Sequence, residues 1–478
     1  MPLFSETIQI VVHRSLKVWS ILIESSEVCV DFVDGDIRFI VSDDCWEAIT
    51  HVCDAASLYM ANAGYRTVVV CHDARLSSPA ISRLVVDRCM CHGLQVMATE
   101  RPVSTCLFYQ TCHDLHAGGI MITASHNPKE YNGLKMVHPT LEPISSNELV
   151  PFLSELKSPT DGKGTIRQVD HTPLYAGTAL QESHLSKDTK ASILIDFLNG
   201  SASVETLAAF RQLPGITVTA LHEHPDGSFP CGEPNPLSEK SISSFRTALK
   251  EHPFDLGFVL DGDGDRIGVF LPDGRRIQPY TILTGVFATG SYPSGSRMLL
   301  DGKTPQSFFT ASVDLSKTGH GAIKKTMLSH PQDQYVLACE GSGHYFYRMQ
   351  NAIVENSLLS MLFTLGLFTQ HRTLLMDLVR RQEATFIGKE MTIHSPQAKS
   401  IGSRVTALFQ KRGSEIISND RYGENLGYQL IRGEGFSLYQ RVSQTETDTL
   451  RWQVNAKDQM TADAVTDLLI HIQKEDVK

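Results

Sequence analysis

The sequence predicts an α/β protein, and three observations support that prediction. Several apolar segments rich in β-branched residues each run into a short polar turn and then into a helix-length stretch. These segments are apolar at successive positions rather than at alternate ones, which is typical of parallel strands covered on both faces. The chain has 478 residues, and at about 150 residues per domain a chain of that length is expected to form roughly three domains.

The predicted strands follow one another along the first half of the chain. Each is a short apolar run bounded by turn residues. They cover residues 66–71 (RTVVVC), 120–123 (IMIT), 191–197 (ASILIDF) and 256–260 (LGFVL). The longest apolar stretch, residues 358–368 (LLSMLFTLGLF), is too short to cross a bilayer and predicts a buried helix.

The C-terminal part of the chain has a different pattern. Strand-like segments at 436–441 (FSLYQR) and 450–454 (LRWQV) precede a predicted helix over 462–474. This arrangement is typical of an α+β domain. Polar and Pro/Gly-rich stretches at 157–165 and 290–296, with a third polar stretch near 380–383, provide the candidate boundaries. The prediction is three α/β domains, over residues 1–165, 166–290 and 291–385, and an α+β domain over residues 386–478.

Composition and charge exclude two classes of partner. The formal net charge of −10 argues against nucleic acid, because phosphate backbones need clustered Lys and Arg. It leaves room for one small anionic substrate in a local basic pocket. No segment is apolar enough to span a membrane, and the N-terminus lacks the pattern of a signal peptide. We therefore expect a cytoplasmic protein.

A serine loop, residues 123–128 (TASHNP), follows one of the predicted strands. Ser125 lies just past the strand end, where α/β proteins present ligands. Pro128 stiffens the turn, and Asn127 tolerates turn geometry. Taken alone, this loop is equally compatible with a functional hydroxyl and with a serine that only bonds its own backbone.

An aspartate loop follows the strand at 256–260. Asp261, Asp263 and Asp265 alternate with glycines, a spacing that lets the backbone wrap a hard cation with oxygen ligands. An EF-hand calcium loop is disfavoured, because Pro272 stands where that loop needs its Glu. Magnesium is the better interpretation, and the adjacent Arg266 indicates a further positive group for a phosphate.

Two further loops carry weaker signals. Glu340 and Ser342 lie on a glycine loop and could face sugar hydroxyls, which need paired donors and acceptors. Arg441 offers a bidentate fork, and the hydroxyls of Ser443 and Thr445 could complete an anion cradle. A plain turn explains the first loop equally well, and an exposed strand end could explain the second.

In this order and at these separations, the four loops resemble those of the α-D-phosphohexomutase superfamily, and more narrowly its phosphomannomutase/phosphoglucomutase branch. The resemblance runs from about residue 32 to the C-terminus. Residues 32–41 (FVDGDIRFIV) are similar to the segment that supplies an active-site arginine, here Arg38, and residues 72–77 (HDARLS) resemble a D-x-R-x-S turn. The implied fold is three similar mixed-sheet α/β domains and a C-terminal α+β domain around a central cleft.

The resemblance also implies a role for each matching residue. Ser125 would carry the phosphoryl group. Lys135 is the first choice for the general acid/base, on the expectation that Mg²⁺ and arginine lower its pKa. The metal site would hold one Mg²⁺ through Asp261, Asp263, Asp265 and an oxygen of phospho-Ser125. The other implied residues are Arg38, His126 and Arg266 at the reacting group, Glu340, Ser342, His344 and His320 at the sugar, and Arg441, Ser443 and Thr445 at the second phosphate.

The implied reaction interconverts a hexose 6-phosphate and a hexose 1-phosphate. A hexose 1,6-bisphosphate would be both the intermediate and the activator, and the protein would be a monomer or homodimer. Gln444 and the segment Asp36–Arg38 favour mannose phosphate, with phosphoglucomutase and phosphoglucosamine mutase activities as alternatives. A homologue that binds sugar phosphates but has lost catalysis is the alternative of another class. Phe39, Cys339 and Thr447 depart from the residues common at these positions in the family.

Overall fold

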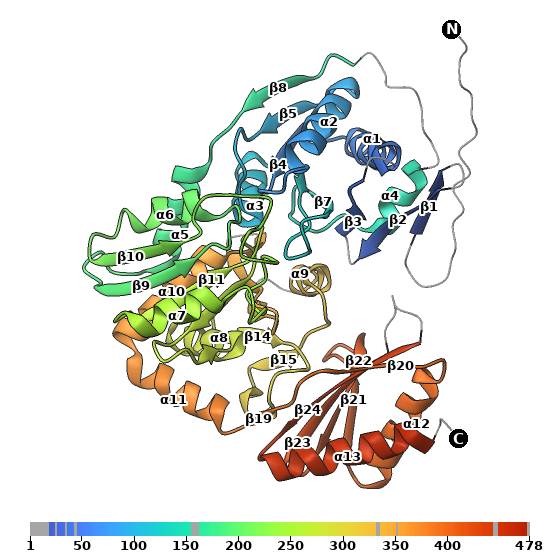
Figure 1. Cartoon of the computed structure of the whole chain (residues 1–478), viewed down its shortest axis with the longest axis vertical. Helices are drawn as coiled ribbons and strands as arrows, with labels where there is room; N and C mark the ends of the chain where they lie inside the picture. Colours follow the sequence, from blue (N-terminus) through green and yellow to red (C-terminus); the bar gives the residue numbers. More distant parts are fainter. Residues whose placement is uncertain are drawn as a thin grey trace. The chain divides into compact units, whose positions relative to one another are not determined.

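The structure, a computed structural model, describes residues 19–23, 26–33, 36–42, 45–153, 162–330, 335–349, 352–442 and 448–475. The chain divides into two compact units, and Figure 1 labels the helices and strands that form them. Unit 1 comprises Met1–Arg276 and Ala352–Leu365, and unit 2 comprises Ile277–Asn351 and Gly366–Lys478.

Unit 1 contains a mixed sheet of eight strands. Its strands β4, β5, β6 and β8 are parallel, and the strands from β6 through β7, β3 and β2 to β1 pair antiparallel. In sheet order, the strands are β1 (Trp19–Ile23), β2 (Ser26–Val33), β3 (Asp36–Ile40), β7 (Tyr131–Val137), β6 (Gly118–Ile122), β4 (Thr67–His72), β5 (Gln95–Ala98) and β8 (Thr165–Gln168).

Helices cover both faces of this sheet. On one face, Val68 and Val70 of β4 join a core with residues of α1, α2 and α4. On the other face, a side chain on Gly119 of β6 would meet Phe108 and Cys112 of α3. Strands covered in this way are apolar at successive positions, as the sequence predicts. The helices are α1 (Trp46–Asn62), α2 (Ser78–Cys91), α3 (Thr105–Leu115) and α4 (Ser146–Leu153).

The second sheet of unit 1 carries the aspartate loop. Strands β10, β9 and β11 are parallel, and β12 pairs antiparallel with β11. The strands are β10 (Ile216–Leu221), β9 (Ala191–Asp196), β11 (Leu256–Leu260) and β12 (Ile267–Phe270). The other elements of unit 1 are α5 (Thr172–Ser183), α6 (Ser203–Phe210), α7 (Ser243–Glu251), β18 (Ala352–Glu355) and the first part of α10 (Ser357–Gln370), while β13 (Arg276–Ile277) lies where the chain passes to unit 2.

Unit 2 begins with a third α/β arrangement. Strand β14 is parallel to β15 and β16, and β17 pairs antiparallel with β16. The strands are β14 (Arg297–Leu300), β15 (Val313–Leu315), β16 (Tyr335–Cys339) and β17 (Tyr345–Met349). The helices of this part are α8 (Pro279–Thr289), α9 (His320–Leu328), the end of α10 and α11 (Arg372–Glu383), with a short 3-10 helix, η2 (Gln306–Phe308).

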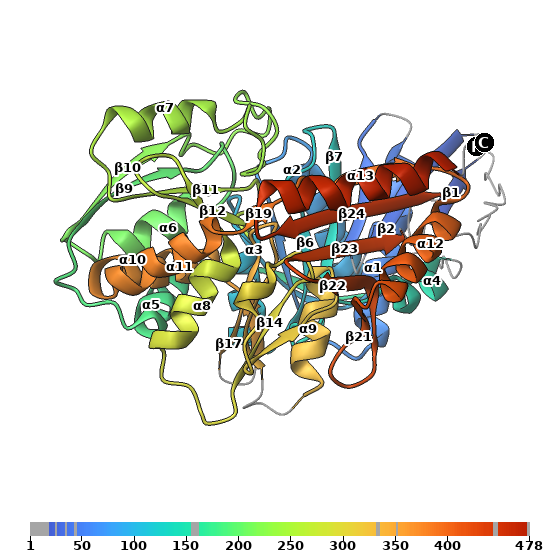
Figure 2. The ribbon, with the colours of Figure 1, turned by 90° about the horizontal axis from the view of Figure 1, so that it is seen from below.

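The C-terminal part of unit 2 is an antiparallel sheet with two helices on one face (Figure 2). Both helices share one apolar core with the sheet, centred on the buried Trp452. This is the α+β arrangement that the sequence predicts. The elements are β19 (Phe386–Ile387), β20 (Met391–His394), α12 (Ala398–Lys411), β21 (Glu415–Asn419), β22 (Asn425–Gly433), β23 (Phe436–Val442), β24 (Thr449–Ala456) and α13 (Gln459–Glu475).

The structure confirms the predicted α/β class and the main predicted elements. The strand at Leu256–Leu260 has the predicted bounds, and β4, β6 and β9 differ from them by one or two residues. The predicted apolar helix is α10, and most of its first turns are buried. Among the described residues, no helix is both long and apolar enough to cross a membrane. The division into four domains and the central cleft stay predictions.

Candidate functional site

The serine loop of unit 1 holds Ser125 in an unusual backbone conformation. Strand β6 ends at Ile122, and Ser125 follows with a φ of 50°, in the left-handed region that residues other than glycine rarely adopt. Its amide donates to Thr123 Oγ1 at 2.9 Å. Its hydroxyl is buried and donates to Asp261 Oδ2 at 2.8 Å, while His126 Nδ1 lies 3.4 Å from it. The hydroxyl therefore points at the aspartate loop.

The aspartate loop is the tight turn between β11 and the antiparallel β12. The Gly264 amide donates to the Asp261 carbonyl at 3.1 Å, and Gly264 has a φ of 67°. A Cβ there would also lie 2.6 Å from Cβ of Ala202, so only glycine fits. The Arg266 amide donates to Asp261 Oδ1 at 3.1 Å. This turn directs three carboxylates to one point.

The three carboxylates form a candidate cation site. One oxygen each of Asp261, Asp263 and Asp265 can be chosen so that all lie within 4.8 Å of one another, and all three residues are buried. Within the described part of the chain, Asp263 Oδ1 is buried without a hydrogen-bond partner. An oxygen of this kind needs compensation in the interior. Hard oxygen ligands from few carboxylates fit Mg²⁺.

Lys135 brings a positive charge to this cluster from strand β7. Its Nζ lies 2.9 Å from Asp263 Oδ2 and 2.5 Å from Asp265 Oδ2. Burial alone would lower the pKa of Lys135, but the charges of Asp263 and Asp265 hold it well above its ordinary value. The expectation that Mg²⁺ and arginine lower that pKa concerns the metal-bound site and stays a prediction.

The carboxylates of the cluster are not equivalent. Burial raises the pKa of Asp261 well above its ordinary value, and the negative charges of Asp265 and Asp263 add to the effect. Burial also acts to raise the pKa of Asp263, but Lys135 and a hydrogen bond from Thr105 hold it below the ordinary range. The Thr105 hydroxyl donates to Asp263 Oδ2 at 2.7 Å from the first turn of α3.

Arg38 approaches the serine loop from strand β3. Its Nη1 donates to the Thr123 carbonyl at 2.5 Å, and its Nη2 pairs with Asp36 at 2.6 Å. Arg38 and Gly133 are direct partners across β3 and β7, and a Cβ on Gly133 would lie 3.1 Å from Arg38 Nη1. The departure at Phe39 leaves this arrangement intact, because adjacent strand residues face opposite sides and Phe39 is buried in the core.

Unit 2 positions the predicted sugar loop at the end of β16. The Glu340 carboxylate accepts from the Gly319 amide at 2.8 Å, and the Ser342 hydroxyl lies 3.5 Å from its other oxygen. The rings of His320 and His344 stack with centroids 6.0 Å apart. The structure thus brings together the four residues that the sequence analysis assigns to the sugar.

The predicted phosphate loop is described only in part. Arg441 is the penultimate residue of β23 and pairs with Arg451 across the sheet. Ser443 and Thr445, like Gln444 and Thr447, lie outside the described residues.

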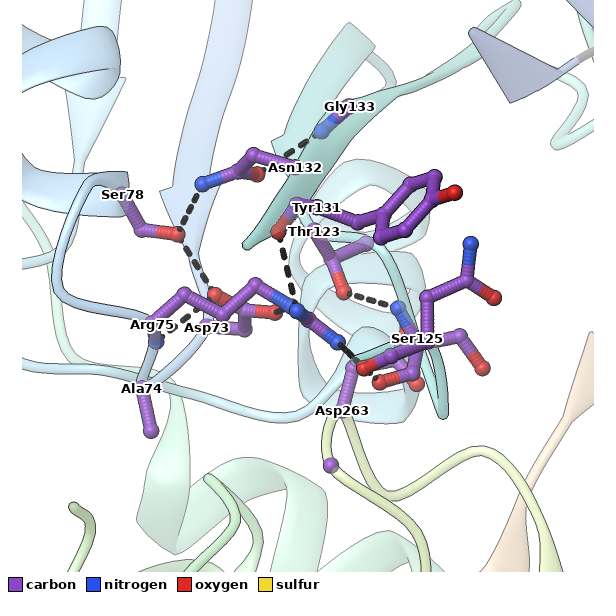
Figure 3. Close-up of polar contacts among 12 residues, drawn as sticks. Asp73, Ala74, Arg75, Ser78, Thr123, Ser125, Tyr131, Asn132, Gly133 and Asp263 are labelled. Carbon is purple, nitrogen blue, oxygen red and sulfur yellow. Dashed lines mark hydrogen bonds and ion pairs between the residues drawn. The ribbon is translucent and has the colours of Figure 1, made fainter. Parts of the chain in front are cut away.

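The structure adds residues that the sequence analysis did not assign to the site. Thr105 and Thr123 bond the aspartate and serine loops. Ser201 accepts from the Ala74 amide at 3.0 Å and donates to the Gly262 carbonyl at 3.1 Å. Arg75 bonds the serine loop through several carbonyls (Figure 3). The one available signal was the D-x-R-x-S turn, which marks Arg75 after a buried strand.

Two family models match parts of the chain that lie in unit 1. The model described as Phosphoglucomutase/phosphomannomutase, alpha/beta/alpha domain I matches residues 31–149, and the model for alpha/beta/alpha domain II matches residues 174–274. The first range contains the serine loop, and the second contains the aspartate loop. The serine and aspartate loops therefore lie within the matched ranges, and the predicted sugar and phosphate loops lie outside them.

Curated relatives cover most of the chain. Phosphohexose mutases of Xanthomonas campestris pv. campestris (strain B100) are 29% identical over 406 residues, which is 82% of this chain and 89% of the relative. A phosphomannomutase/phosphoglucomutase of Pseudomonas aeruginosa (strain PAO1) is 27% identical over 443 residues, 89% of this chain and 92% of the relative.

A solved structure shares the fold. The phosphoglucomutase/phosphomannomutase family protein from Burkholderia thailandensis superimposes with a TM-score of 0.79 at 21% identity, covering 93% of this chain and 98% of that one. A multi-domain α/β fold is common to both proteins.

Proposed function

Because the chain belongs to the α-D-phosphohexomutase superfamily, we propose that it interconverts the 6-phosphate and the 1-phosphate of a hexose, with mannose as the first-choice sugar. Relatives named phosphohexose mutases and phosphomannomutase/phosphoglucomutase support the phosphohexomutase activity. The observation that carries the mechanism is the hydroxyl of Ser125, 2.8 Å from Asp261 in a cluster of three buried carboxylates.

Ser125 is the proposed phosphoryl carrier. A phosphoryl group on its hydroxyl passes to the free O1 or O6 of the hexose, which gives the 1,6-bisphosphate and the free serine. The bisphosphate then presents its other phosphate, and Ser125 takes that group back. Atoms balance over the two steps, because each transfer breaks one P–O bond and forms another. A hexose 1,6-bisphosphate from solution loads the serine for the first turnover.

Asp261, Asp263 and Asp265 are the proposed ligands of one Mg²⁺. Their carboxylate oxygens and the buried Oδ1 of Asp263 fit a hard divalent cation. Bound there, Mg²⁺ would supply the positive charge that a transferring phosphoryl group needs. Phosphoryl transfer depends mainly on positioning and charge neutralisation, so the residues around Ser125 act chiefly as fixed charges and donors.

Lys135 is the proposed general acid/base for the reacting sugar hydroxyl. Its Nζ lies 2.9 Å from Asp263 Oδ2 and 2.5 Å from Asp265 Oδ2, in contact with two of the proposed metal ligands. Arg38, His126 and Arg266 are proposed to orient the reacting oxygen and the phosphoryl group. Arg38 and His126 are tied to the serine loop, at 2.5 Å from the Thr123 carbonyl and 3.4 Å from the Ser125 hydroxyl.

Further residues are proposed to bind the sugar ring and the phosphate that does not react. Sugar hydroxyls need donors and acceptors together, and the Glu340 carboxylate and Ser342 hydroxyl provide both. An arginine fork suits a phosphate that does not react. The proposed assignments are Glu340, Ser342, His344 and His320 for the sugar, and Arg441, Ser443 and Thr445 for the second phosphate.

Mannose and glucose differ only in the configuration at C2, so one site can accept both. Gln444 and Asp36–Arg38 favour mannose. The Pseudomonas aeruginosa relative, named for both activities, makes glucose the second candidate. We also propose a cytoplasmic location and a monomer or homodimer.

Intact-mass measurement tests the serine carrier. The wild-type protein treated with glucose 1,6-bisphosphate and Mg²⁺ is expected to gain the mass of one phosphoryl group, and Ser125→Ala is expected to lose that gain together with mutase activity. Ser57→Ala, at a buried serine of α1, is the matched control and should keep both. An unchanged phosphoryl gain in Ser125→Ala would refute the assignment.

Coupled assays with mannose 1-phosphate and glucose 1-phosphate test the reaction and the sugar. A higher kcat/KM for mannose 1-phosphate is expected. Inertness toward both sugars, in a protein that still binds them, would instead support the homologue that has lost catalysis.

A further inference from the structure

Arg75 is a fully buried arginine in the turn between β4 and α2. Its relative exposure is 0%, which is unusual because arginine is almost never buried unless its charge and its donors are compensated. Every N–H of the guanidinium has an acceptor in the structure. Hydrogen bonds around the whole edge of the planar guanidinium therefore hold the side chain in one orientation.

Four of the five acceptors are backbone carbonyls of one short segment. Nη2 donates to the carbonyls of Ser125 and Asn127 at 2.8 and 2.7 Å. Nη1 donates to those of Pro128 and Tyr131 at 2.6 and 2.9 Å. Four carbonyls of this segment thus converge on one cation, and Figure 3 shows those of Ser125 and Tyr131 at the guanidinium. A planar group with five fixed donors can hold such a set, and an ammonium with three donors cannot.

The fifth donor anchors the guanidinium to its own turn. Nε donates to Asp73 Oδ2 at 3.1 Å. The other oxygen of Asp73 accepts from the Arg75 amide at 3.0 Å and from the Ser78 hydroxyl at 2.5 Å. The ring of Phe229 lies 5.3 Å from the guanidinium carbon, on its face. These contacts fix the guanidinium relative to the turn between β4 and α2.

The same guanidinium also bonds the backbone of the reactive serine. Ser125 has a φ of 50°, and a conformation of this kind persists only where the surroundings determine it. Its amide is bonded to Thr123 Oγ1 and its carbonyl to Arg75, so both sides of the residue are fixed. In that conformation the hydroxyl reaches Asp261.

From these contacts the structure assigns Arg75 the role of positioning residue for Ser125: it holds the loop at residues 125–131 in the conformation that aims the phosphoryl-carrying hydroxyl at the aspartate loop. The inference rests on the proposed function for the reaction step. Arg75 touches the backbone of the loop and acts on the reaction only through it. A loop displaced by about 1 Å can lose on the order of 100-fold in rate.

Arg75→Lys in the full-length protein is the direct test. The charge remains, but the four carbonyls lose their common donor. The expected result is a fall in kcat on the order of 100-fold with KM for the sugar phosphate held within about threefold, because the side chain of Arg75 bonds the serine loop and its own turn. Hydrogen–deuterium exchange of residues 123–132 should become faster.

Leu249→Ala is the control for a merely structural role. Leu249 is buried in the core of α7 and β11 in the same unit, and its truncation lowers stability without touching the serine loop. It should lower the melting temperature but leave kcat and the exchange of residues 123–132 as in the wild type. A kcat for Arg75→Lys equal to that of the wild type or of Leu249→Ala overturns the inference.

If Arg75→Lys does not fold, Ser78→Ala tests the positioning role of Arg75 instead. It removes the hydrogen bond that Ser78 donates to Asp73 and so loosens the anchor only indirectly. It also removes the one that Ser78 accepts from Asn132 at 2.9 Å, so the exchange is read over residues 125–131. A smaller fall in kcat with faster exchange at 125–131 supports the role, and unchanged values overturn it. A wild-type protein that turns over neither sugar phosphate marks failure of the proposed function. The exchange of the serine loop in the two variants then judges Arg75 independently of any activity.

Discussion

At the residue scale, neighbouring carboxylates of one loop experience opposite electrostatic environments. Asp263 contacts Lys135 and Thr105, which favour its charged form. Asp261 accepts hydrogen bonds from the Ser125 hydroxyl and the Arg266 amide. It is nevertheless buried beside two other carboxylates, and its pKa is raised. The position nearest the serine is therefore the one that most needs a cation.

Asp261→Asn is predicted to stabilise the protein in EDTA. The pKa of Asp261 is higher in the folded protein than in the unfolded chain, where it is about 3.9. Ionised Asp261 therefore reduces stability above that unfolded value, and the reduction grows until the pH passes the folded pKa. The neutral amide removes this cost, so the melting temperature at pH 7 should rise by a few degrees.

The gain from Asp261→Asn should shrink as the pH falls toward 4, and the rise in melting temperature that Mg²⁺ gives the wild type should be lost. Asp188→Asn, at an exposed position, controls for the removal of one negative charge. Thermal melts from pH 4 to pH 8, with EDTA and with Mg²⁺, measure both effects. A lower melting temperature for Asp261→Asn in EDTA at pH 7 would contradict the prediction.

At the element scale, the pairing of β3 with β7 sets the positive side of the site. The register places Arg38 opposite Gly133 and Asp36 opposite Lys135. A Cβ at Gly133 would lie 2.0 Å from the backbone carbonyl of Ile37, which cannot move as a flexible side chain can. The glycine is therefore required for the two strands to approach.

Gly133→Ala is predicted to lower stability by about 1–3 kcal/mol through this overpacking, and to lower activity because Arg38 is displaced. Gly177→Ala is the matched control, because no described atom lies within 4 Å of a Cβ added there in α5. It should raise stability by about 0.5–1 kcal/mol, as an alanine in a helix does. Denaturant unfolding measures both, and equal shifts in the two variants would contradict the argument.

Strands with a continuous apolar pattern could be predicted from the sequence, and strands without it could not. Strand β11 has the predicted bounds because all five residues are apolar or glycine and all are buried. Strand β7 (YNGLKMV) carries Asn, Gly and Lys, yet six of its seven residues are buried. Its polar side chains are buried because they bond loops from elsewhere, and such partners are absent from a local pattern.

In the site, too, features with a local sequence pattern could be predicted and features without one could not. Each loop could be recognised from residue types and spacing, but Ser125 and Asp261 are 136 positions apart, and no local pattern fixes that pairing. Arg75 stayed without a role because its acceptors are backbone carbonyls, which every residue offers. The direction of the Lys135 pKa shift could not be predicted from a local pattern either, because it depends on which charges contact the ammonium, and Asp263 and Asp265 are distant in sequence.

At the scale of the whole molecule, the proposed metal ligands and the serine all belong to unit 1, although that unit takes its residues from two stretches of chain. A ligand that binds only the folded state stabilises it, by about 2.7 kcal/mol at a concentration of 100 times Kd. The C-terminal sheet of unit 2 has its own apolar core around Trp452. The effect of Mg²⁺ should therefore be local.

Removal of Mg²⁺ with EDTA is predicted to speed hydrogen–deuterium exchange in the serine loop and in the turn between β11 and β12. The physical reason is that the carboxylates of Asp261, Asp263 and Asp265 repel one another without the cation. Exchange in β22 and β23 should change little, because their hydrogen bonds and core contain none of these groups. Asp261→Asn, which is expected to bind Mg²⁺ poorly, should show the same exchange with and without EDTA. Equal acceleration in both units would place the cation's effect outside the aspartate loop and contradict the assignment of its ligands.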